Sequence, residues 1–111
     1  MPIDTERLEH NKLTQIHGQV IWDFSRSKVD IYSELGQVPA NYVSEVLADK
    51  SQPKKITAAW RFLKDSNELE LSDFHIDGEP REHSIKLAIR PAGQVRINLG
   101  NEQYNTEYKN Q

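Results

Sequence analysis

Residues 27–47, SKVDIYSELGQVPANYVSEVL, decide the fold that the sequence predicts, because no other stretch carries the pattern of a complete supersecondary motif. The hydroxyl of Ser27 can cap a first helix, and Gly36 can end that helix in the left-handed conformation. Pro39 suits the first position of a second helix, which is expected to run to about Asp49.

Each of these two helices would carry an apolar stripe at helical spacing. The stripe residues are Ile31, Tyr32 and Leu35 in the first helix, Val38 in the turn, and Tyr42, Val43, Val46 and Leu47 in the second. Two short helices that bury facing stripes across a tight turn form a helix-turn-helix.

This segment resembles the helix-turn-helix of Cro and of phage-repressor-type DNA-binding proteins. The matching positions are Ser27-Lys28, Ile31, Leu35-Gly36, Val38-Pro39, Tyr42-Val43-Ser44 and Val46-Leu47. The resemblance implies a domain that binds double-stranded DNA. In that family the start of the second helix faces base edges, which assigns the base contacts to Ala40, Asn41 and Ser44. The phosphate contacts would come from Ser27, Lys28, Lys50, Lys54 and Lys55.

The composition is that of a small cytoplasmic protein. The chain has 111 residues and no cysteine, so neither a disulfide scaffold nor a thiol nucleophile is expected. Charged residues interrupt every apolar run, which excludes a signal peptide and a membrane span from the prediction.

The charge balance is uneven along the chain. The net charge of −3 argues against an indiscriminate nucleic-acid binder, because such binders neutralise phosphates with lysine and arginine. Residues 1–53 hold eight acids against five bases, whereas residues 54–111 hold nine of each. The half that is predicted to read DNA is therefore the acidic half.

A first helix is predicted over about residues 4–25. Its apolar residues at near-helical spacing are Leu8, Leu13, Ile16, Val20, Ile21 and Phe24. The segment Lys55–Leu63 fits both a strand and a helix, and the turn residues 64–67 that follow favour the strand.

An antiparallel sheet is predicted for the C-terminal half. Leu69 and Leu71 alternate in one phase and Phe74 and Ile76 in the other, which predicts a bulge or a change of face at residues 72–73. A hairpin is predicted around a turn at residues 91–93, its inward residues being Ile85, Leu87, Ile89, Val95, Ile97 and Leu99. Residues 101–111 are polar without a period and are expected to form a frayed tail.

Catalytic and metal sites find little support in the sequence. Residues 75–83 contain two histidines and three carboxylates, but Gly78 and Pro80 are typical of an ordinary connection, so no metal site is expected. No serine lies in a nucleophile elbow and no glycine-rich loop could hold phosphates. The chain is therefore predicted not to be an enzyme and to need no cofactor.

A second candidate surface lies on the outer side of the predicted sheet. If the apolar residues of these strands point inward, a set of cations points outward: Arg61, Lys86, Arg90 and Arg96. No aromatic residue accompanies them to stack on bases. Such a face could bind an acidic partner, or it could be a solvated face whose cations pair with Glu68 and Glu70.

The sequence as a whole predicts one α+β domain over residues 1–100, with N-terminal helices that include a helix-turn-helix-like pair, followed by an antiparallel sheet of three or four strands. The leading hypothesis for function is a DNA-binding regulator that forms a homodimer. The alternative is a non-enzymatic protein-interaction module that uses the sheet face or an exposed edge strand.

Overall fold

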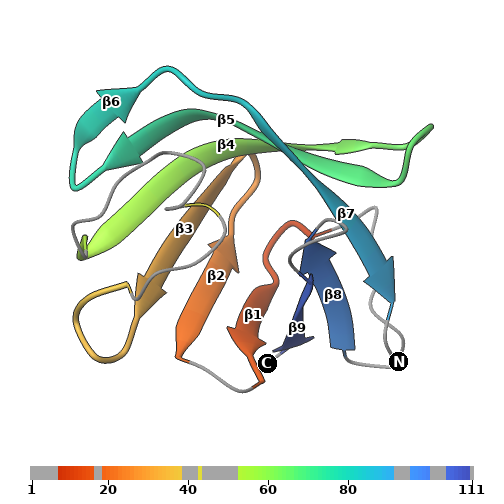
Figure 1. The fold of residues 1–111 in the computed structure, drawn as a ribbon, viewed down its shortest axis with the longest axis horizontal. Coiled ribbons are helices and arrows are strands. Elements are labelled where there is room, and N and C mark those ends of the chain that lie inside the picture. The colour runs from red at the N-terminus through yellow and green to blue at the C-terminus, as the bar shows by residue number, and fades with distance from the viewer. Residues whose placement is uncertain are drawn as a thin grey trace.

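The protein is an all-β closed barrel (Figure 1). The computed structural model describes residues 8–16, 19–38, 43, 53–91, 96–100 and 105–110. The strands are β1 Lys12–Gln15, β2 Val20–Phe24, β3 Lys28–Ser33, β4 Lys55–Leu63, β5 Glu68–Ile76, β6 Glu79–Arg81, β7 Ile85–Pro91, β8 Arg96–Gly100 and β9 Asn105–Asn110.

The strands follow the order β4-β3-β2-β1-β9-β8-β7-β5-β6, and β4 also pairs with β5. All of these pairs are antiparallel, so eight strands close a ring and the short β6 extends the sheet beside β5. Because β1 pairs with β9, the two ends of the chain complete the barrel.

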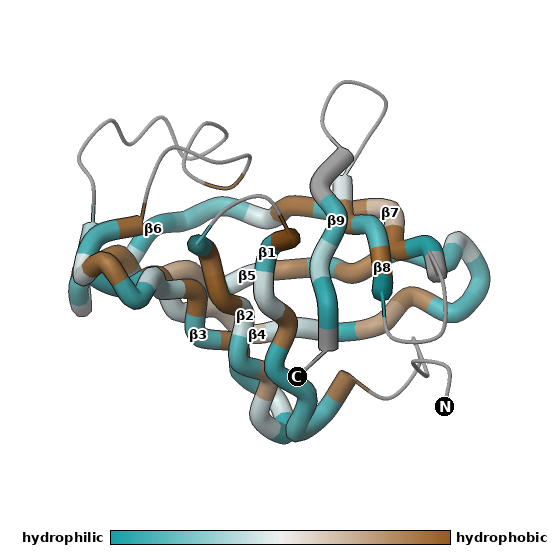
Figure 2. Tube along the Cα trace, turned by 90° about the horizontal axis from the view of Figure 1, so that it is seen from below, coloured by the Kyte–Doolittle hydropathy of each residue, from teal (hydrophilic) through white to brown (hydrophobic). Residues whose placement is uncertain are grey.

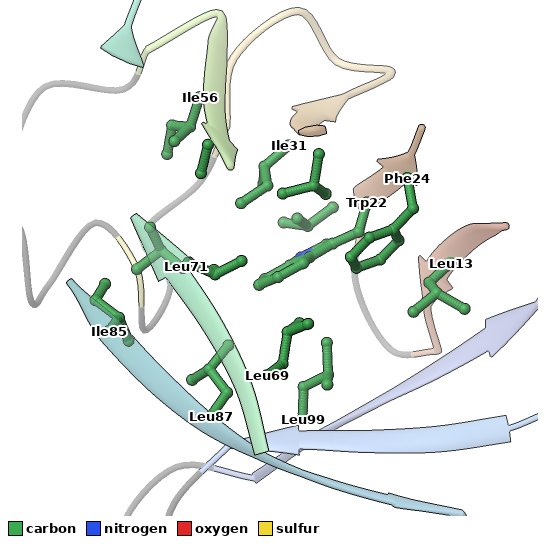
Figure 3. Close-up of a cluster of buried hydrophobic side chains, with 14 of the residues drawn as sticks. Leu13, Trp22, Phe24, Ile31, Ile56, Leu69, Leu71, Ile85, Leu87 and Leu99 are labelled. Carbon is green, nitrogen blue, oxygen red and sulfur yellow. The ribbon is translucent and has the colours of Figure 1, made fainter. Parts of the chain in front are cut away.

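The core forms because alternate side chains of each strand point into the barrel. In β2 the inward residues Val20, Trp22 and Phe24 are at most 3% exposed. Trp22 lies opposite Ile31 of β3, which in turn lies opposite Ile56 of β4. Figure 2 shows the resulting alternation of hydrophilic and hydrophobic residues along the strands, and Figure 3 shows the inward side chains packed together.

A β-bulge in β5 keeps its inward residues in phase, as the sequence predicts. Ser72 lies opposite Ala59 and His75 lies opposite Thr57, so two residues of β5 face one residue of β4. Asp73 in this bulge has a left-handed backbone, with a φ of 52°. The bulge brings four side chains of β5 to the interior: Leu69, Leu71, Phe74 and Ile76.

Residues from the connections cover both ends of the barrel. Leu8 precedes β1 and is fully buried, and the neighbouring His10 donates its backbone N–H to the carbonyl of Phe24. At the other end, Val38 and Val43 join the core from the segment between β3 and β4. The described interior is therefore a packed apolar core.

The predicted α+β fold is wrong. Strands β1 and β2 occupy the helix predicted over residues 4–25, and β3 occupies the first helix of the predicted pair. The second predicted helix lies outside the described residues except for Val43, whose backbone is helical and whose side chain is buried. Because the first helix is absent, the helix-turn-helix is not formed.

The reason is that tertiary pairing outweighs local helical spacing. Ser27, the expected helix cap, lies in the β2–β3 turn, where the N–H of Ser25 donates to the carbonyl of Lys28 over 2.8 Å. Ile31 is fully buried only because β2 and β4 flank it.

The C-terminal predictions have mixed outcomes. The strand over residues 55–63, the turn after it and the pairing of β7 with β8 are confirmed. The sheet is larger than the three or four strands predicted. The frayed tail is also corrected, because Asn105–Asn110 forms β9, which pairs with β8 and β1 and buries Tyr108.

Candidate binding surfaces

The predicted base-contact residues Ala40, Asn41 and Ser44, and the predicted phosphate contact Lys50, lie outside the described residues. The other predicted phosphate contacts are far apart on the barrel. Ser27 and Lys28 lie at the start of β3, and Lys55 lies opposite Tyr32 near its end.

Three of these lysines have structural roles, one through its side chain and two through their backbone. The Nζ of Lys28 lies 3.2 Å from Oδ2 of Asp73 in the β5 bulge. The backbone N–H groups of Lys54 and Lys55 donate to Oδ1 of Asp77, over 2.9 and 3.0 Å. Asp77 thereby ties the β5–β6 turn to the start of β4.

The four cations of the alternative prediction are Arg61 of β4, Lys86 and Arg90 of β7, and Arg96 of β8, and we call them the basic wall. The strands that carry them are adjacent on the barrel, with β5 between β4 and β7. Glu70 of β5 lies opposite both Arg61 and Lys86, and Arg90 lies opposite Asn98. All four cations are exposed.

The members of the basic wall differ in their partners. An Nη2 of Arg61 lies 2.7 Å from Oε1 of Glu70, and an Nη1 of Arg96 lies 3.2 Å from Oε1 of Glu107. Lys86 and Arg90 form no hydrogen bond or ion pair with any residue in the described part of the chain. Because Lys86 and Arg90 have no ion-pair partner among the described residues, their charges are available to a binding partner. The exposed ion pairs of Arg61 and Arg96 contribute little to stability.

Carboxylates occupy the opposite side of the barrel. Around the ring, β2 is separated from β7 by three strands in each direction: by β1, β9 and β8 on one side and by β3, β4 and β5 on the other. On the outer side of β2 and β3, Asp23 lies directly opposite Asp30, and Lys12 of β1 lies opposite Asp23. The hydrogen bond with Tyr32, helped by the charge of Asp23, raises the pKa of Lys12 above its ordinary value.

The interior contains a pair of aromatic side chains with polar atoms, Trp22 and Tyr108, that no sequence pattern predicted. The rings of Trp22 and Tyr108 meet edge to face with centroids 5.7 Å apart, and the residues are 3% and 4% exposed. Burial raises the pKa of Tyr108 far above its ordinary value, and a hydrogen-bonding interaction with the Trp22 indole lowers this pKa by less, so the phenol is neutral.

The indole Nε1 of Trp22 is buried and makes no close hydrogen bond to any described residue, so its interaction with the Tyr108 phenol is a long one. The other tryptophan differs, because Nε1 of Trp60 donates to the carbonyl of Ser25 over 3.0 Å. Val20, Trp22 and Phe24 occupy alternate inward positions, but the apolar Ile21 between them hides this alternation in the sequence. Tyr108 lies in the segment that was expected to form a frayed tail, so no sequence pattern predicted its burial.

The described residues show no metal-ligand cluster and no membrane-spanning helix. Among them, no three histidine, aspartate or glutamate side chains gather as ligands for a metal ion. Within the same ranges no helix has the length and apolar character needed to cross a membrane. In comparisons with known proteins, no family model, curated protein or solved structure matches the chain.

Proposed function

We propose that this protein is a non-enzymatic binding module whose basic wall docks onto an acidic surface of a partner protein. One observation carries the proposal: Lys86 and Arg90 are exposed on one side of β7 without an ion-pair partner in the described ranges. Paired cations flank them on both sides, Arg61 on β4 and Arg96 on β8.

The arrangement favours a protein over a nucleic acid. Glu70 lies within the wall and Glu107 lies beside it on β9, where both would repel a continuous line of phosphates. No phenylalanine, tyrosine or tryptophan accompanies the basic wall on the described outer faces of β4, β5, β7 and β8, so bases would find no large stacking platform. A protein surface with carboxylates facing Lys86 and Arg90 would match this mixed pattern, since complementary charges set orientation and association rate.

A synthetic glutamate-rich peptide with a fluorescent label is a suitable probe, because fluorescence anisotropy then reports binding as salt is varied. The double variant Lys86→Glu/Arg90→Glu should bind roughly tenfold more weakly at low salt, which corresponds to about 1.4 kcal/mol. The matched control is Arg26→Glu/Lys64→Glu, which makes the same change of net charge in the β2–β3 and β4–β5 turns. This control should bind within about twofold of the parent.

The comparison between the two double variants decides the outcome. Equal weakening in both would mean that net charge alone attracts the peptide, and the basic wall would then have no special role. Tighter binding of a duplex or single-stranded oligonucleotide than of the peptide, with the same sensitivity to Lys86→Glu/Arg90→Glu, would overturn the choice of a protein partner.

A further inference from the structure

Two like charges lie directly opposite each other on the outer faces of β8 and β9. Arg96 of β8 is the register partner of Lys109 of β9, and both residues are exposed. The Cβ atoms of directly opposite residues are about 5 Å apart, and like charges at this spacing destabilise a sheet. The ion pair of Arg96 with Glu107 offsets this repulsion in part. Lys109 has no ion-pair or hydrogen-bond partner in the part of the chain that the structure describes, so its charge is not neutralised.

Arg90 brings a third positive charge to the same end of the sheet. β7, β8 and β9 are consecutive strands of the ring, so their outer faces form one surface (Figure 1). Arg90 of β7 lies opposite Asn98 of β8, and Arg96 is the next outward residue of that strand. Arg90 and Arg96 are therefore diagonal neighbours, with a Cβ separation of about 7–8 Å that long side chains can span. We call Arg90, Arg96 and Lys109 the cation triad.

The cation triad leaves two positive charges uncompensated. On the described outer faces of β7, β8 and β9, its three cations face a single carboxylate, that of Glu107. Residues 92–95, which join β7 to β8, contain no acid that could add a second one. The carboxamide of Asn98, which lies opposite Arg90, adds a further donor. One incoming carboxylate would therefore neutralise only half of the excess charge.

We infer that the cation triad holds the phosphate group of a phosphoserine on the partner protein, so that phosphorylation of the partner controls docking onto the basic wall. This inference rests on the proposed function, because it specifies the partner of the same surface. A phosphoserine carries about two negative charges at neutral pH and three strong acceptor oxygens, which match the charge and the donors of the triad. Arginine and lysine both bind phosphate through charge-assisted hydrogen bonds. A single phosphate needs only this one site, whereas the phosphates of a nucleic acid continue in a line past Glu70 and Glu107.

The test compares three short peptides that differ in one central residue, which is phosphoserine, glutamate or serine, with glycine and alanine on both sides. Titration followed by heteronuclear NMR measures their affinities and also locates the site. The phosphoserine peptide should bind at least roughly tenfold more tightly than the glutamate peptide, because it makes more charge-assisted hydrogen bonds. It should shift the amide resonances of Asn98 and Lys109 and leave that of Arg26 in place.

The variant Lys109→Gln removes the unpaired cation and leaves the Arg96–Glu107 ion pair in place. It should weaken binding of the phosphoserine peptide roughly tenfold, the loss expected for one hydrogen bond to a charged group. Binding of the glutamate peptide should change by at most about threefold. Lys64→Gln is the matched control, because it makes the same change of charge at an exposed position in the β4–β5 turn. This control should bind the phosphoserine peptide within about twofold of the parent.

Three results would overturn the inference. The first is equal affinity for the phosphoserine and glutamate peptides, and the second is equal weakening by Lys109→Gln and Lys64→Gln. The third is binding of inorganic phosphate as tight as that of the phosphoserine peptide, which would make the triad a site for free phosphate.

The phosphate site and the proposed function can fail separately. Binding of the glutamate-rich peptide that depends on Lys86 and Arg90, without any preference for phosphoserine, would refute the phosphate site and leave the basic wall its role. Equal weakening of the glutamate-rich peptide by Lys86→Glu/Arg90→Glu and its control would refute the proposed function, whatever the short peptides show.

Discussion

Tyr108 is the buried residue whose ionisation couples most directly to folding. Its ring packs against Trp22 at the centre of the barrel wall, and burial raises the pKa of its phenol. The folded protein therefore holds this proton more tightly than the unfolded chain, in which a tyrosine has a pKa of about 10. Folding and alkaline titration are linked through this one group.

Stability should fall as the pH rises above about 10, because the unfolded chain then loses the Tyr108 proton while the folded chain keeps it. Below that pH the contribution is fully present. The slope attributable to this group is about 1.4 kcal/mol per pH unit. Urea unfolding of the parent and of Tyr108→Phe across this range measures it, and the variant should show the shallower decline. Parallel declines would mean that Tyr108 is not the group responsible.

At the scale of single elements, the sequence predicted strands where alternation was regular. Leu69 and Leu71 followed by Phe74 and Ile76 predicted the bulge, because only an extra residue lets both phases face inward. The sequence did not predict the N-terminal strands, because their short apolar runs fit both the two-residue period of a strand and the 3.6-residue period of a helix. Ile21 is buried on the outer side of β2, so Val20, Ile21 and Trp22 form a continuous run without visible alternation.

Deleting Asp73 should leave a cooperative unfolding transition. Without this extra residue Phe74 would lie opposite Ala58 and the register with β4 would be regular, so Phe74 and Ile76 would still point inward. Deleting Ser72 and Asp73 together is the contrasting variant, because it shifts the alternation by one residue and turns Phe74 and Ile76 to the outside of β5. Circular dichroism during thermal unfolding should show a cooperative transition for the first deletion and none for the second. Loss of the transition on deletion of Asp73 alone would show that the bulge itself is needed for folding.

The Asp77 carboxylate offers a second test at this scale. It accepts the backbone N–H groups of both Lys54 and Lys55, and Asp77-Gly78 forms the two-residue turn between β5 and β6 with left-handed φ values of 49° and 87°. Asp77→Ala should lower the free energy of unfolding by about 1–3 kcal/mol, whereas Asp77→Asn keeps one acceptor and should lose less. Equal losses in urea unfolding would assign the effect to the turn conformation instead.

At the scale of the whole molecule, closure of the ring depends on residues that are distant in the sequence. β9 pairs with β8, its neighbour along the chain, and with β1, which begins almost one hundred positions earlier. No local sequence pattern could have predicted the pairing of β1 with β9. Closure also removes the open edge on which the expectation of a homodimer rested, because each of the eight ring strands pairs on both sides over part of its length. The state of assembly stays a prediction.

Ending the chain at Tyr104 should prevent the barrel from folding. The truncation would remove β9, leave β1 and β8 without partners on one side, and take Tyr108 away from Trp22. Two unpaired edges favour association between chains, so light scattering should show aggregates and thermal unfolding should lose its cooperative transition. Removal of Gln111 alone, which follows the last residue of β9, is the control and should melt like the parent. Adding a peptide of residues 101–111 to the truncated chain should restore a cooperative transition, because the peptide supplies the missing strand. A truncated chain that is monomeric and melts cooperatively without the peptide would contradict the role of β9 in closing the barrel.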